Sequence, residues 1–449
     1  MRFVIVGGDA AGMSAASRAK RIDPQLDVVV LEQTGDVSYS ACGMPYNIAD
    51  PQRDIEELVV RRAEVFRDKN GIDLRTGHRA DRIDPTSMIV SGFDHTREEF
   101  EIAYDKLLIA TGASAIRPDL PGFDLPGVMV LKSLEEGRRI KELLRSRRTR
   151  RVVIIGMGYV ALEMAESLRT LELDVAMVKP RPVFLPWMPE ELSRVVLDEL
   201  HAEGVGTHAG QGVNAIEAAG GDDSRLRVLC DEETIEADMV LVAIGVTPNS
   251  AIAGEAGLDL SVGRSIMVDR RMRTSQPDIF AAGDCADAFH VVDGQRAWIP
   301  LALRANRAGW AAADNVCGRA TEIEGIAGTA VFKVFGLEVA RTGLNAKEAR
   351  AAGFDPVEVV VKTRSRAHGH PGSTPIWNQM VGDRKSGRLL GMQMVGREGV
   401  AHRINAPAVA LHNRMTVAQF SQCDLAYAPP FGPTWDPTLT TANQLLKKL

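Results

Sequence analysis

The chain contains one local pattern twice, in which a short apolar run ends in a glycine-rich turn and continues into a helix-forming stretch. The first copy has RFVIVG at residues 2–7 with its turn at residues 7–12, and the second has RVVIIG at residues 151–156 with its turn at residues 156–161. A strand, a glycine-rich turn and a helix in this order form the dinucleotide-binding fingerprint, in which a pyrophosphate lies on the helix N-terminus. Two copies therefore predict an α/β chain that binds two dinucleotides, a carrier cofactor and a nicotinamide donor.

The first turn departs from the usual pattern at one position, because Asp9 stands where the middle glycine is expected. Support for a dinucleotide comes from Glu32, which ends the next apolar run, residues 26–32, and follows Gly12 by 20 residues. An acidic side chain at that distance accepts hydrogen bonds from the ribose hydroxyls. We therefore expect the first unit to bind the ribose as well as the pyrophosphate of its dinucleotide.

The second turn matches G-x-G-x-x-A in full, but a basic residue, Lys179, stands in the place that Glu32 has in the first unit. Pro180 and Arg181 follow it. A carboxylate at this place would repel a 2′-phosphate, whereas Lys179 and Arg181 would pair with it. This difference favours NADPH over NADH. The alternative is that both side chains lie in a solvated loop.

Three further segments are typical of strands that return the chain to a bound nucleotide. Residues 104–112 (YDKLLIATG) end in small residues, residues 240–248 (VLVAIGVTP) repeat that pattern in the second unit, and residues 279–284 (IFAAGD) end in Asp284. An Asp directly after a glycine can accept hydrogen bonds from a sugar-alcohol chain that passes the sheet edge. Cys285, which follows, is expected to be a packed thiol.

One cysteine, Cys42, stands in the segment SYSACGMPY, residues 38–46. Gly43 permits a close approach of the backbone, and Pro45 restricts the path by which the chain leaves, so the thiol is expected on a fixed and exposed turn. It becomes a reactive thiolate if a positive charge or a helix N-terminus lowers its pKa. The alternative is an inert, small apolar residue, as a lone cysteine often is.

The five cysteines are far apart in the chain, at Cys42, Cys230, Cys285, Cys317 and Cys423. None forms a CxxC or CxxxxC pair, and their number is odd, which excludes a disulfide scaffold and a cysteine-ligated metal site. Whatever Cys42 does, it is expected to do with a sulfur from outside the chain.

The overall composition excludes several classes of protein. The 449 residues carry a net charge of -6, which argues against nucleic acid or an anionic membrane as the main partner. Apolar runs stay well short of the roughly 20 residues that cross a bilayer. The N-terminus enters a strand directly, so we expect no signal peptide and a cytoplasmic location.

The last third of the chain has no nucleotide fingerprint. A long helix is expected over residues 300–316, and alternating patterns then predict strands over residues 330–335, 357–363 and 389–395 and one helix over residues 399–414. This combination predicts a separate α+β domain.

Two other stretches are unusual in composition. Residues 138–151 (RRIKELLRSRRTRR) are expected to form the solvated face of a helix. Residues 424–437 hold four prolines and three aromatic residues, so Tyr427 can be held at a fixed position at low entropic cost. Tyr427 is either part of an interface cap or an acid beside a reacting thiolate.

Taken in order, these motifs resemble the pyridine nucleotide-disulfide oxidoreductases, and within them the branch that uses a single cysteine. That branch contains coenzyme A-disulfide reductases, coenzyme A-persulfide and polysulfide reductases, and water-forming NADH oxidases. The resemblance covers nearly the whole chain. It rests on Glu32 and on six segments, which are residues 7–12, 38–46, 110–112, 156–161, 281–286 and 424–436.

The resemblance implies an α/β chain of three domains. An FAD-binding domain, residues 1–115 and 247–322, is split around an NAD(P)H-binding domain at residues 116–246, and an α+β dimerisation domain covers residues 323–449. Members of the family are homodimers in which the C-terminal domain of one subunit completes the active site of the other.

By the same resemblance, Tyr427 is expected to reach the partner's Cys42 and flavin. The oxidases of the branch typically carry a His in the first turn, where this chain has Ala10, and this weighs against oxygen reduction as the main task. In the reductases a second tyrosine commonly precedes a Pro-Gly pair, where this chain has His370. His370 either exchanges a proton with the substrate or merely packs.

The resemblance also implies which residues contact the cofactors and the substrate. Contacts to the two cofactors are expected from Gly7, Asp9, Ala10, Ala11, Gly12, Glu32, Gln33, Ser40, Ala110, Thr111, Gly112, Asp284, Leu301, Ala302, Phe431, Gly156, Met157, Gly158, Tyr159, Val160, Glu163, Lys179, Arg181 and Gly245. Coenzyme A carries three phosphate groups and needs basic residues at its entry. Its contacts are expected from Arg18, Arg21, Ser38, Arg61, Asn306, Arg307 and His370, with Lys20 and Arg62 beside them. No metal is expected.

The activity that follows from the resemblance is FAD-dependent reduction of coenzyme A disulfide, or of a coenzyme A persulfide or polysulfide, by NAD(P)H. Cys42 forms a mixed disulfide with coenzyme A, and Tyr427 of the partner subunit protonates the leaving thiolate. Two alternatives stay open. One is an NAD(P)H oxidase that reduces oxygen through a Cys42 sulfenic acid, and the other is a non-catalytic flavin redox sensor that alters partner binding.

Overall fold

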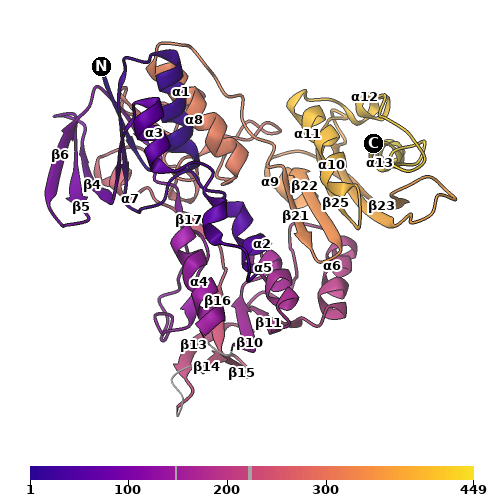
Figure 1. The fold of residues 1–449 in the computed structure, drawn as a ribbon. Coiled ribbons are helices and arrows are strands. Elements are labelled where there is room, and N and C mark those ends of the chain that lie inside the picture. The colour runs from indigo at the N-terminus through magenta and orange to yellow at the C-terminus, as the bar shows by residue number, and fades with distance from the viewer. Residues whose placement is uncertain (147–148, 221–224) are drawn as a thin grey trace.

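The structure is a computed structural model that describes residues 1–146, 149–220 and 225–449. It has three parts (Figure 1): a first nucleotide-binding domain at the upper left, a second one below it, and the C-terminal domain at the right. The chain passes from the first domain to the second and back again before it enters the C-terminal domain.

The first domain is built on a parallel five-stranded sheet with the order β18-β7-β1-β2-β3. Its strands and main helices are β1 Arg2–Val6, α1 Ala10–Ile22, β2 Asp27–Glu32, α3 Ala63–Asn70, β3 Asp73–Thr76, β7 Lys106–Ile109, β18 Ile279–Ala281 and α8 Ala302–Val316. Both faces of the sheet are covered, so β1 is apolar at every buried position. Helices α1 and α8 pack so closely that a Cβ atom on Gly309 would lie 2.2 Å from the Ala11 backbone oxygen.

The second domain repeats this arrangement with the sheet order β12-β11-β10-β16-β9, again all parallel. Its strands and helices are β9 Val128–Met129, α4 Leu134–Ser146, β10 Arg151–Ile155, α5 Tyr159–Thr170, β11 Asp174–Lys179, α6 Glu190–Ala202, β12 Gly206–Ala209 and β16 Met239–Val242. In each domain the strand before the glycine-rich turn lies in the middle of the sheet. The two Rossmann-like domains predicted from the repeated pattern are confirmed.

Each nucleotide domain also carries a small antiparallel three-stranded sheet. These sheets consist of β4 His78–Asp84, β5 Ile89–Asp94 and β6 Glu99–Ala103 in the first domain, and of β13 Val213–Ala218, β14 Leu226–Cys230 and β15 Thr234–Ala237 in the second. Where the chain crosses between the domains, β8 Ala113–Ala115 pairs with β17 Val246–Pro248. The domain limits expected at residues 115 and 247 fall in these two strands and stay predictions.

Shorter elements complete the first domain and its loops. They are the helices α2 Met44–Ile48 and α7 Ala251–Glu255, the strands β19 Ala288–Phe289 and β20 Arg296–Ala297, and single 3₁₀ turns at Ala41–Gly43, Ile55–Leu58 and Val262–Arg264.

The C-terminal domain has an antiparallel five-stranded sheet with the order β21-β22-β25-β24-β23, covered by helices, so the predicted α+β domain is confirmed. Its elements are β21 Ala330–Val334, β22 Leu337–Gly343, α9 Ala346–Ala351, β23 Pro356–Arg364, β24 Pro375–Asp383, β25 Leu389–Gly396, α10 Val400–Arg403, α11 Asn405–His412, α12 Val417–Ser421 and α13 Pro437–Leu446.

Three details of the sequence interpretation are wrong. Strands β22 and β24 were missed, and in β24 the reason is that polar Asn378 and Gln379 are buried in a central strand. The single helix expected over residues 399–414 is two helices, because Pro407 lies in the first turn of α11 and has no N–H to continue α10. The basic stretch 138–151 is a solvated face only in part: Arg139, Arg145, Arg150 and Arg151 are exposed, but Lys141 is only 5% exposed. Its residues 147–148 lie outside the described residues.

Within the described ranges, every helix is too short or too polar to cross a lipid bilayer.

Candidate active site

The first glycine-rich turn is shaped for close contact with a ligand. Gly7 has φ of 112°, and a Cβ atom on Gly12 would lie 1.8 Å from the Gly7 oxygen, so the turn packs directly onto the start of α1. Among the described residues no side chain caps α1, because Asp9 at its N-cap makes no such bond. The free N–H groups of this first helical turn fit a pyrophosphate.

Two carboxylates lie beside this turn. Glu32 at the end of β2 accepts 2.8 Å hydrogen bonds from the backbone N–H groups of Gly8 and Thr34. Burial raises the pKa of Asp9 to about 6, opposed by a hydrogen bond from the Tyr39 N–H and by the charge of Lys132. Glu32 thus faces the turn from the neighbouring strand, as the sequence interpretation requires for a ribose contact.

A third carboxylate, Asp284, follows β18 at the same edge of the sheet, and Lys132 lies 3.1 Å from it. The turn that carries Asp284 is held by Arg304, a buried side chain of α8 that donates to the Gly283 oxygen at 2.8 Å and to the Ala286 oxygen at 2.9 Å. Asp9, Glu32 and Asp284 therefore gather at the carboxyl edge of the first sheet, although they are far apart in sequence.

The small residues after β7 border the same edge. The Ala110 N–H donates to the Val6 oxygen at 2.8 Å, and the Thr111 hydroxyl donates to the Asn249 oxygen at 2.5 Å. Gly112 has φ of 70°, and a Cβ atom there would meet no described atom within 4 Å. Room for a ligand thus remains beside Gly112. Leu301, another residue expected to contact a cofactor, is the N-cap of α8.

The second glycine-rich turn combines one crowded and one open glycine. A Cβ atom on Gly156, whose φ is 118°, would lie 2.3 Å from the Ala243 oxygen. Gly158 is the N-cap of α5, and a Cβ atom there would meet no described atom within 4 Å. A crowded turn that closes on the sheet and an open helix N-terminus fit a second dinucleotide.

Cys42 lies in the 3₁₀ turn directly before α2, and its side chain is exposed. The loop around it is fixed by backbone hydrogen bonds, from the Ser40 N–H to the Leu58 oxygen and from the Val60 N–H to the Ser38 oxygen, both at 2.8 Å. Ser38 has φ of 49°, in the left-handed region. The expectation of a fixed and exposed thiol is confirmed.

The charges around Cys42 do not by themselves activate it. Partial desolvation, and then the Glu163 carboxylate, raise the pKa of the Cys42 thiol above its usual range, and the Lys132 ammonium opposes them. Glu163 lies on α5 and accepts a 2.8 Å hydrogen bond from the Tyr46 phenol on α2. All five cysteines of the chain are free thiols.

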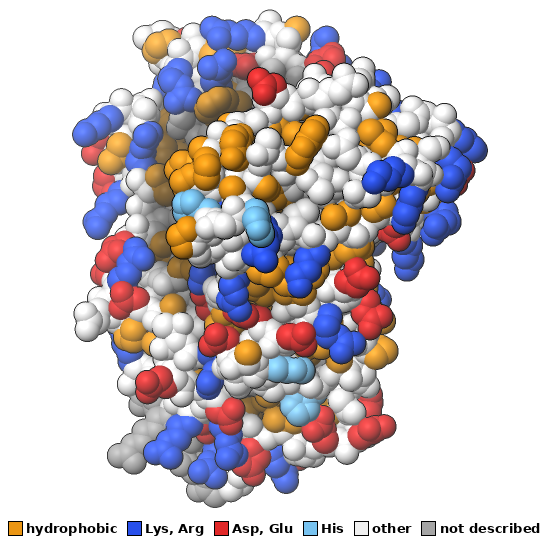
Figure 2. Space-filling model, turned by 90° about the vertical axis from the view of Figure 1, so that its right-hand side faces the viewer, with side chains coloured by type: hydrophobic (Ala, Val, Ile, Leu, Met, Phe, Trp, Pro, Cys, Tyr) orange, Lys and Arg blue, Asp and Glu red, His pale blue; other side chains and the backbone are white. Residues whose placement is uncertain are grey.

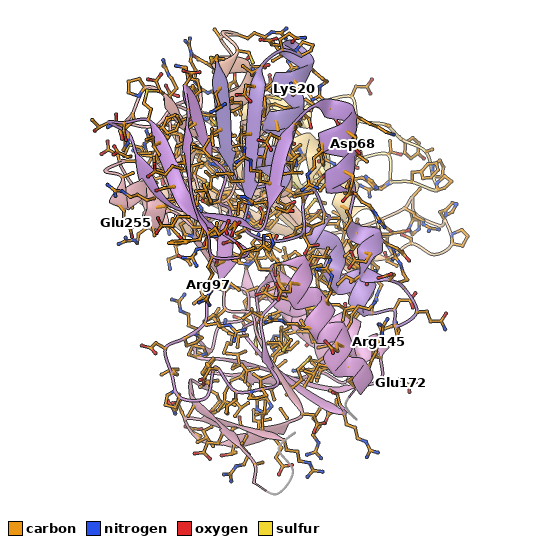
Figure 3. All side chains as sticks on the ribbon, turned by 60° about the vertical axis from the view of Figure 1, so that its left-hand side comes forward. Lys20, Asp68, Arg97, Arg145, Glu172 and Glu255 are labelled. Carbon is orange, nitrogen blue, oxygen red and sulfur yellow. The ribbon has the colours of Figure 1, made fainter. Side chains whose placement is uncertain are left out.

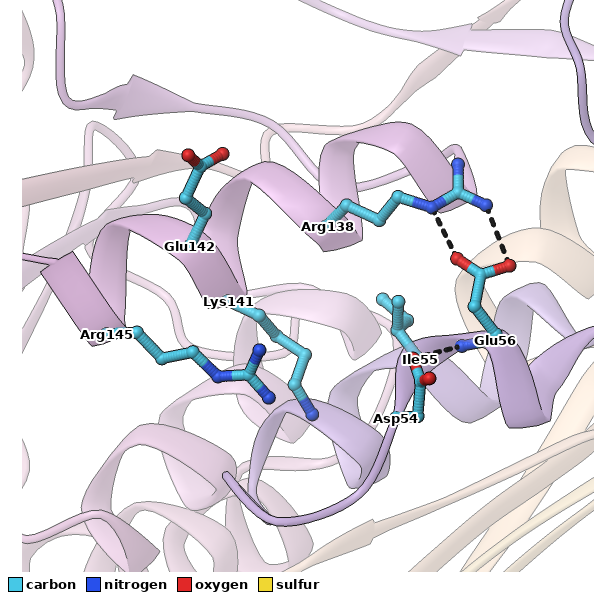
Figure 4. Close-up of a pocket in the computed structure, with 7 residues that line it drawn as sticks. All are labelled: Asp54, Ile55, Glu56, Arg138, Lys141, Glu142 and Arg145. Carbon is cyan, nitrogen blue, oxygen red and sulfur yellow. Dashed lines mark hydrogen bonds and ion pairs between the residues drawn. The ribbon is translucent and has the colours of Figure 1, made fainter.

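Helix α4 of the second domain holds the loop that follows Cys42 (Figure 4). The Lys141 ammonium donates to the backbone oxygens of Asn47, Asp50 and Arg53 at 2.7–2.9 Å, and to the Asn47 side chain at 2.7 Å. One turn further on, Arg145 donates to the Pro51 oxygen at 2.9 Å. These cations border a cavity of ≈ 430 Å³.

The basic residues proposed for coenzyme A lie mainly on α1 and α8. Arg18 forms an ion pair with Asp314 at 2.8 Å, so its charge is already partly neutralised within the protein. Ser14 donates to the Asn306 side-chain oxygen at 2.5 Å, which brings the two helix faces together. Lys20 donates to the Leu26 oxygen at 2.9 Å, at the outer edge of the first domain (Figure 3).

Three other basic candidates have little protein contact. Arg21 on α1 and Arg307 on α8 are exposed. The Arg61 guanidinium lies 5.3 Å from the Phe66 ring centroid, and its backbone N–H bonds to the Ser38 oxygen at 3.3 Å. Arg61 is thus placed beside the Cys42 loop.

The candidate residues of the C-terminal domain lie together. Tyr427 is 49% and Phe431 is 80% exposed, and Arg403 fixes their segment by a 2.6 Å bond to the Phe431 oxygen. The segment meets the His370 loop, where the Ala367 N–H bonds to the Pro429 oxygen at 3.1 Å. Figure 2, which faces the side of the molecule at the right of Figure 1, shows hydrophobic side chains gathered over its upper part.

Sequence reasoning missed Lys132, Tyr46 and Lys141 as parts of the site. Lys132 and Lys141 meet the Cys42 region only through tertiary contacts, and no local motif surrounds them. Tyr46 stands inside the segment that was singled out, four residues after Cys42, at the spacing of neighbours on a helix. In the described part of the chain, no three His, Cys, Asp or Glu side chains gather as a metal site.

Two family models match the chain. The pyridine nucleotide-disulphide oxidoreductase model covers residues 1–309, and the dimerisation domain of the same family covers residues 329–437. The chain belongs to the pyridine nucleotide-disulphide oxidoreductase family. Membership makes it an FAD-dependent NAD(P)H oxidoreductase, and both glycine-rich turns fit that pair of cofactors.

Relatives of this oxidoreductase extend over its whole length. A CoA-dependent NAD(P)H sulfur oxidoreductase of Pyrococcus furiosus is 36% identical over 448 residues, with 99% of each chain covered. An NADH oxidase of Methanocaldococcus jannaschii is 30% identical over 100% of this chain and 99% of its own. A coenzyme A disulfide reductase of Staphylococcus aureus is 28% identical over 96% of each chain.

A solved structure supports the same relationship. The NAD-dependent persulfide reductase from A. fulgidus superposes with a TM-score of 0.95 at 34% identity, over 100% of this chain and 83% of that one.

Proposed function

We propose that this oxidoreductase reduces coenzyme A disulfide, or a coenzyme A persulfide or polysulfide, through Cys42 as its single redox-active cysteine. The observation that carries the proposal is an exposed thiol on a fixed loop, at the boundary of the two nucleotide domains, with no cysteine beside it in the described chain. A substrate must then supply the second sulfur. The names of the Pyrococcus furiosus and Staphylococcus aureus relatives agree with coenzyme A as its carrier.

The thiol chemistry balances with one cysteine. The Cys42 thiolate attacks one sulfur of coenzyme A disulfide, forms a mixed disulfide and releases one coenzyme A thiolate, which takes up a proton. The two electrons that reduce the mixed disulfide would come from NAD(P)H by way of FAD, which the first glycine-rich turn would hold. Reduction of the mixed disulfide restores the Cys42 thiolate and releases the second coenzyme A thiol.

The proton for the leaving thiolate is assigned to Tyr427 of the partner subunit in a homodimer. Support comes from the exposure of Tyr427 and Phe431 on the C-terminal domain and from the match to the dimerisation domain. An exposed aromatic segment held by Arg403 suits a surface that a second subunit covers. His370 lies beside the same segment and is assigned to the substrate side.

We assign coenzyme A phosphates to the faces of α1 and α8 and to Arg61. Arg21 and Arg307 are exposed, and Arg18 and Asn306 lie on the same two helices. NADPH is favoured over NADH because Arg181 is exposed directly after β11. Lys179 is the weaker contact, since its ammonium donates to the Val183 oxygen at 2.6 Å.

The test is mass spectrometry of the purified, unreduced protein together with turnover. We expect the mass of coenzyme A on the Cys42 peptide, its loss after reduction, and NADPH oxidation that depends on coenzyme A disulfide. Cys42→Ser abolishes turnover, whereas Cys423→Ser, at the half-buried cysteine of the C-terminal domain, retains it. An unmodified Cys42 and a Cys42→Ser protein that still reduces the disulfide would disprove the proposal.

A second candidate activity is oxygen reduction through a Cys42 sulfenic acid. The relative named NADH oxidase favours it, while Ala10 in the first turn weighs against it. Oxygen uptake that matches NADPH loss without any added disulfide identifies this activity.

A further inference from the structure

Trp187 lies in the loop between β11 and α6, which follows Lys179 and contains Arg181. Its ring meets the Tyr159 ring edge-on, with centroids 5.9 Å apart and planes at 88°. It also meets the Phe332 ring of β21 at 6.4 Å. Tyr159 stacks on Phe332 at 4.6 Å. We call Tyr159, Trp187 and Phe332 the aromatic triad, which joins the second glycine-rich turn, the β11–α6 loop and the C-terminal domain.

Polar contacts from the C-terminal domain hold the same loop. Asn345, the N-cap of α9, donates from its side chain to the Trp187 oxygen at 3.1 Å. The Arg341 guanidinium lies 5.3 Å from the Trp187 ring centroid and is fixed by Glu348 at 2.8 Å. The position of Trp187 is therefore set in part by residues of the C-terminal domain.

The loop has two fixed ends and an exposed tip. Lys179 closes its start through the 2.6 Å bond to the Val183 oxygen. Phe184, Leu185 and Met188 are buried, which anchors the second half next to Trp187. Arg181, between the two ends, is exposed. The position from which Arg181 can contact a ligand thus depends on how both ends of the β11–α6 loop are held.

We propose that Trp187 is a positioning residue for dinucleotide binding, and that the aromatic triad couples the affinity for NAD(P)H to the packing of the C-terminal domain. Tyr159 follows the open glycine of the second turn, so a shift of its ring moves the backbone that receives the pyrophosphate. Trp187 holds the loop that faces the ribose. Coupling of this kind is reciprocal, so dinucleotide binding also stabilises the contact between the two domains.

The test measures dinucleotide affinity in Trp187→Ala and Phe332→Ala, as full-length enzyme with FAD bound. Phe332 belongs to another domain and is not among the residues assigned to the dinucleotide. We expect each variant to raise the KM for NADPH and the Kd for NADP⁺ by about fivefold, with little change in kcat. Trp187→Phe restores both values, and Val331→Ala, at the exposed neighbour of Phe332, leaves them unchanged.

Two features keep the test decisive. If Phe332→Ala fails to fold, Arg341→Gln, which removes the cation above Trp187 from the same domain, is expected to raise KM in the same direction. Folded variants with normal FAD content whose KM and Kd stay at the parent values would overturn the proposal. The inference rests on the proposed role of the second turn, but an artificial electron acceptor reports KM for the dinucleotide even if coenzyme A disulfide is not the substrate.

Discussion

Tyr46 donates a hydrogen bond of 2.8 Å from its phenol to the carboxylate of Glu163. Tyr46 lies on α2, directly after Cys42, and Glu163 lies on α5, which begins at the second glycine-rich turn. This single bond therefore connects the thiol loop to the domain assigned to the nicotinamide donor. Partial burial raises the pKa of both Tyr46 and Glu163, although Tyr46 remains 42% exposed, so the pair is a half-exposed contact between the two domains.

The first prediction concerns the reactivity of Cys42. After desolvation, the Glu163 carboxylate is the largest influence that raises the pKa of the thiol. Glu163→Gln removes that negative charge while its amide oxygen still accepts from Tyr46, so the thiolate forms at lower pH. We expect the rate of iodoacetamide alkylation of reduced Cys42, followed on the Cys42 peptide, to reach its midpoint at lower pH than in the parent.

Glu172→Gln is the matched control, because Glu172 is an exposed carboxylate beyond the far end of α5 (Figure 3). It should leave the alkylation profile unchanged. A Glu163→Gln profile whose midpoint is equal to that of the parent, or higher, would contradict the electrostatic role given to Glu163.

The second prediction separates the two glycine-rich turns. Gly12→Ala places a methyl group 1.8 Å from the Gly7 backbone oxygen, which cannot yield, so the protein should lose FAD and stability. Gly158→Ala adds a methyl group in open space at φ of -89°, which any residue adopts. We expect it to keep the fold and the FAD but to raise the KM for NADPH about tenfold, or about 1.4 kcal/mol.

Flavin absorbance and thermal unfolding check the first half of this pair, and steady-state kinetics check the second. Gly158→Ala with an unchanged KM would mean that the open space at the start of α5 is not where the dinucleotide binds.

Local sequence patterns were enough to predict the two glycine-rich turns, the placement of Glu32 beside the first of them, and the exposed Cys42 loop. Each depends on residues within one strand–turn–helix unit, where the chain geometry fixes what a Gly or an acidic side chain can do. They failed where tertiary contacts override composition. Lys141 is basic and lies in a run of basic residues, yet it is buried because three backbone oxygens of another domain satisfy its ammonium.

Strand β24 illustrates the same limit. Asn378 and Gln379 interrupt its apolar pattern, but Asn378 bonds to the Thr363 hydroxyl of β23 at 2.8 Å, so a polar residue is tolerated in the centre of the sheet. The role of Lys132 beside Asp284 likewise depends on a contact between residues far apart in sequence, which no motif encodes.

The third prediction follows from the contacts of Lys141. Lys141→Met keeps the length of the side chain but removes the ammonium that bonds to the oxygens of Asn47, Asp50 and Arg53. We expect the free energy of local unfolding of the loop at residues 47–53 to fall by about 3 kcal/mol. Faster hydrogen exchange at the amides of Asp50 and Arg53 measures it, because their N–H groups bond to the Asn47 and Asp50 oxygens of the same loop.

Arg139→Met is the control for Lys141→Met. Arg139 is a neighbour on α4 whose only described partner is Glu135, at 2.7 Å and in an exposed position. Exposed pairs of this kind contribute about 0.5 kcal/mol or less, so exchange in the loop should not change. Equal protection of the Asp50 and Arg53 amides in both variants would show that Lys141 does not hold the loop.

The last prediction is a pH dependence of stability that comes from Asp9. Burial raises its pKa from the ordinary 3.8 to about 6, so the folded chain favours the protonated acid. Ionisation of Asp9 therefore destabilises the folded, flavin-free protein as pH rises from about 4. The loss in the free energy of unfolding is complete above pH 6 and is at most about 3 kcal/mol.

Asp9→Asn retains an acceptor for the Tyr39 N–H and cannot ionise. We expect its thermal midpoint to exceed that of the parent at pH 7.5 and to converge with it near pH 4, whereas Asp68→Asn, at an exposed position of α3, changes neither. A gain that is equal at both pH values would assign the effect to packing and not to the charge of Asp9.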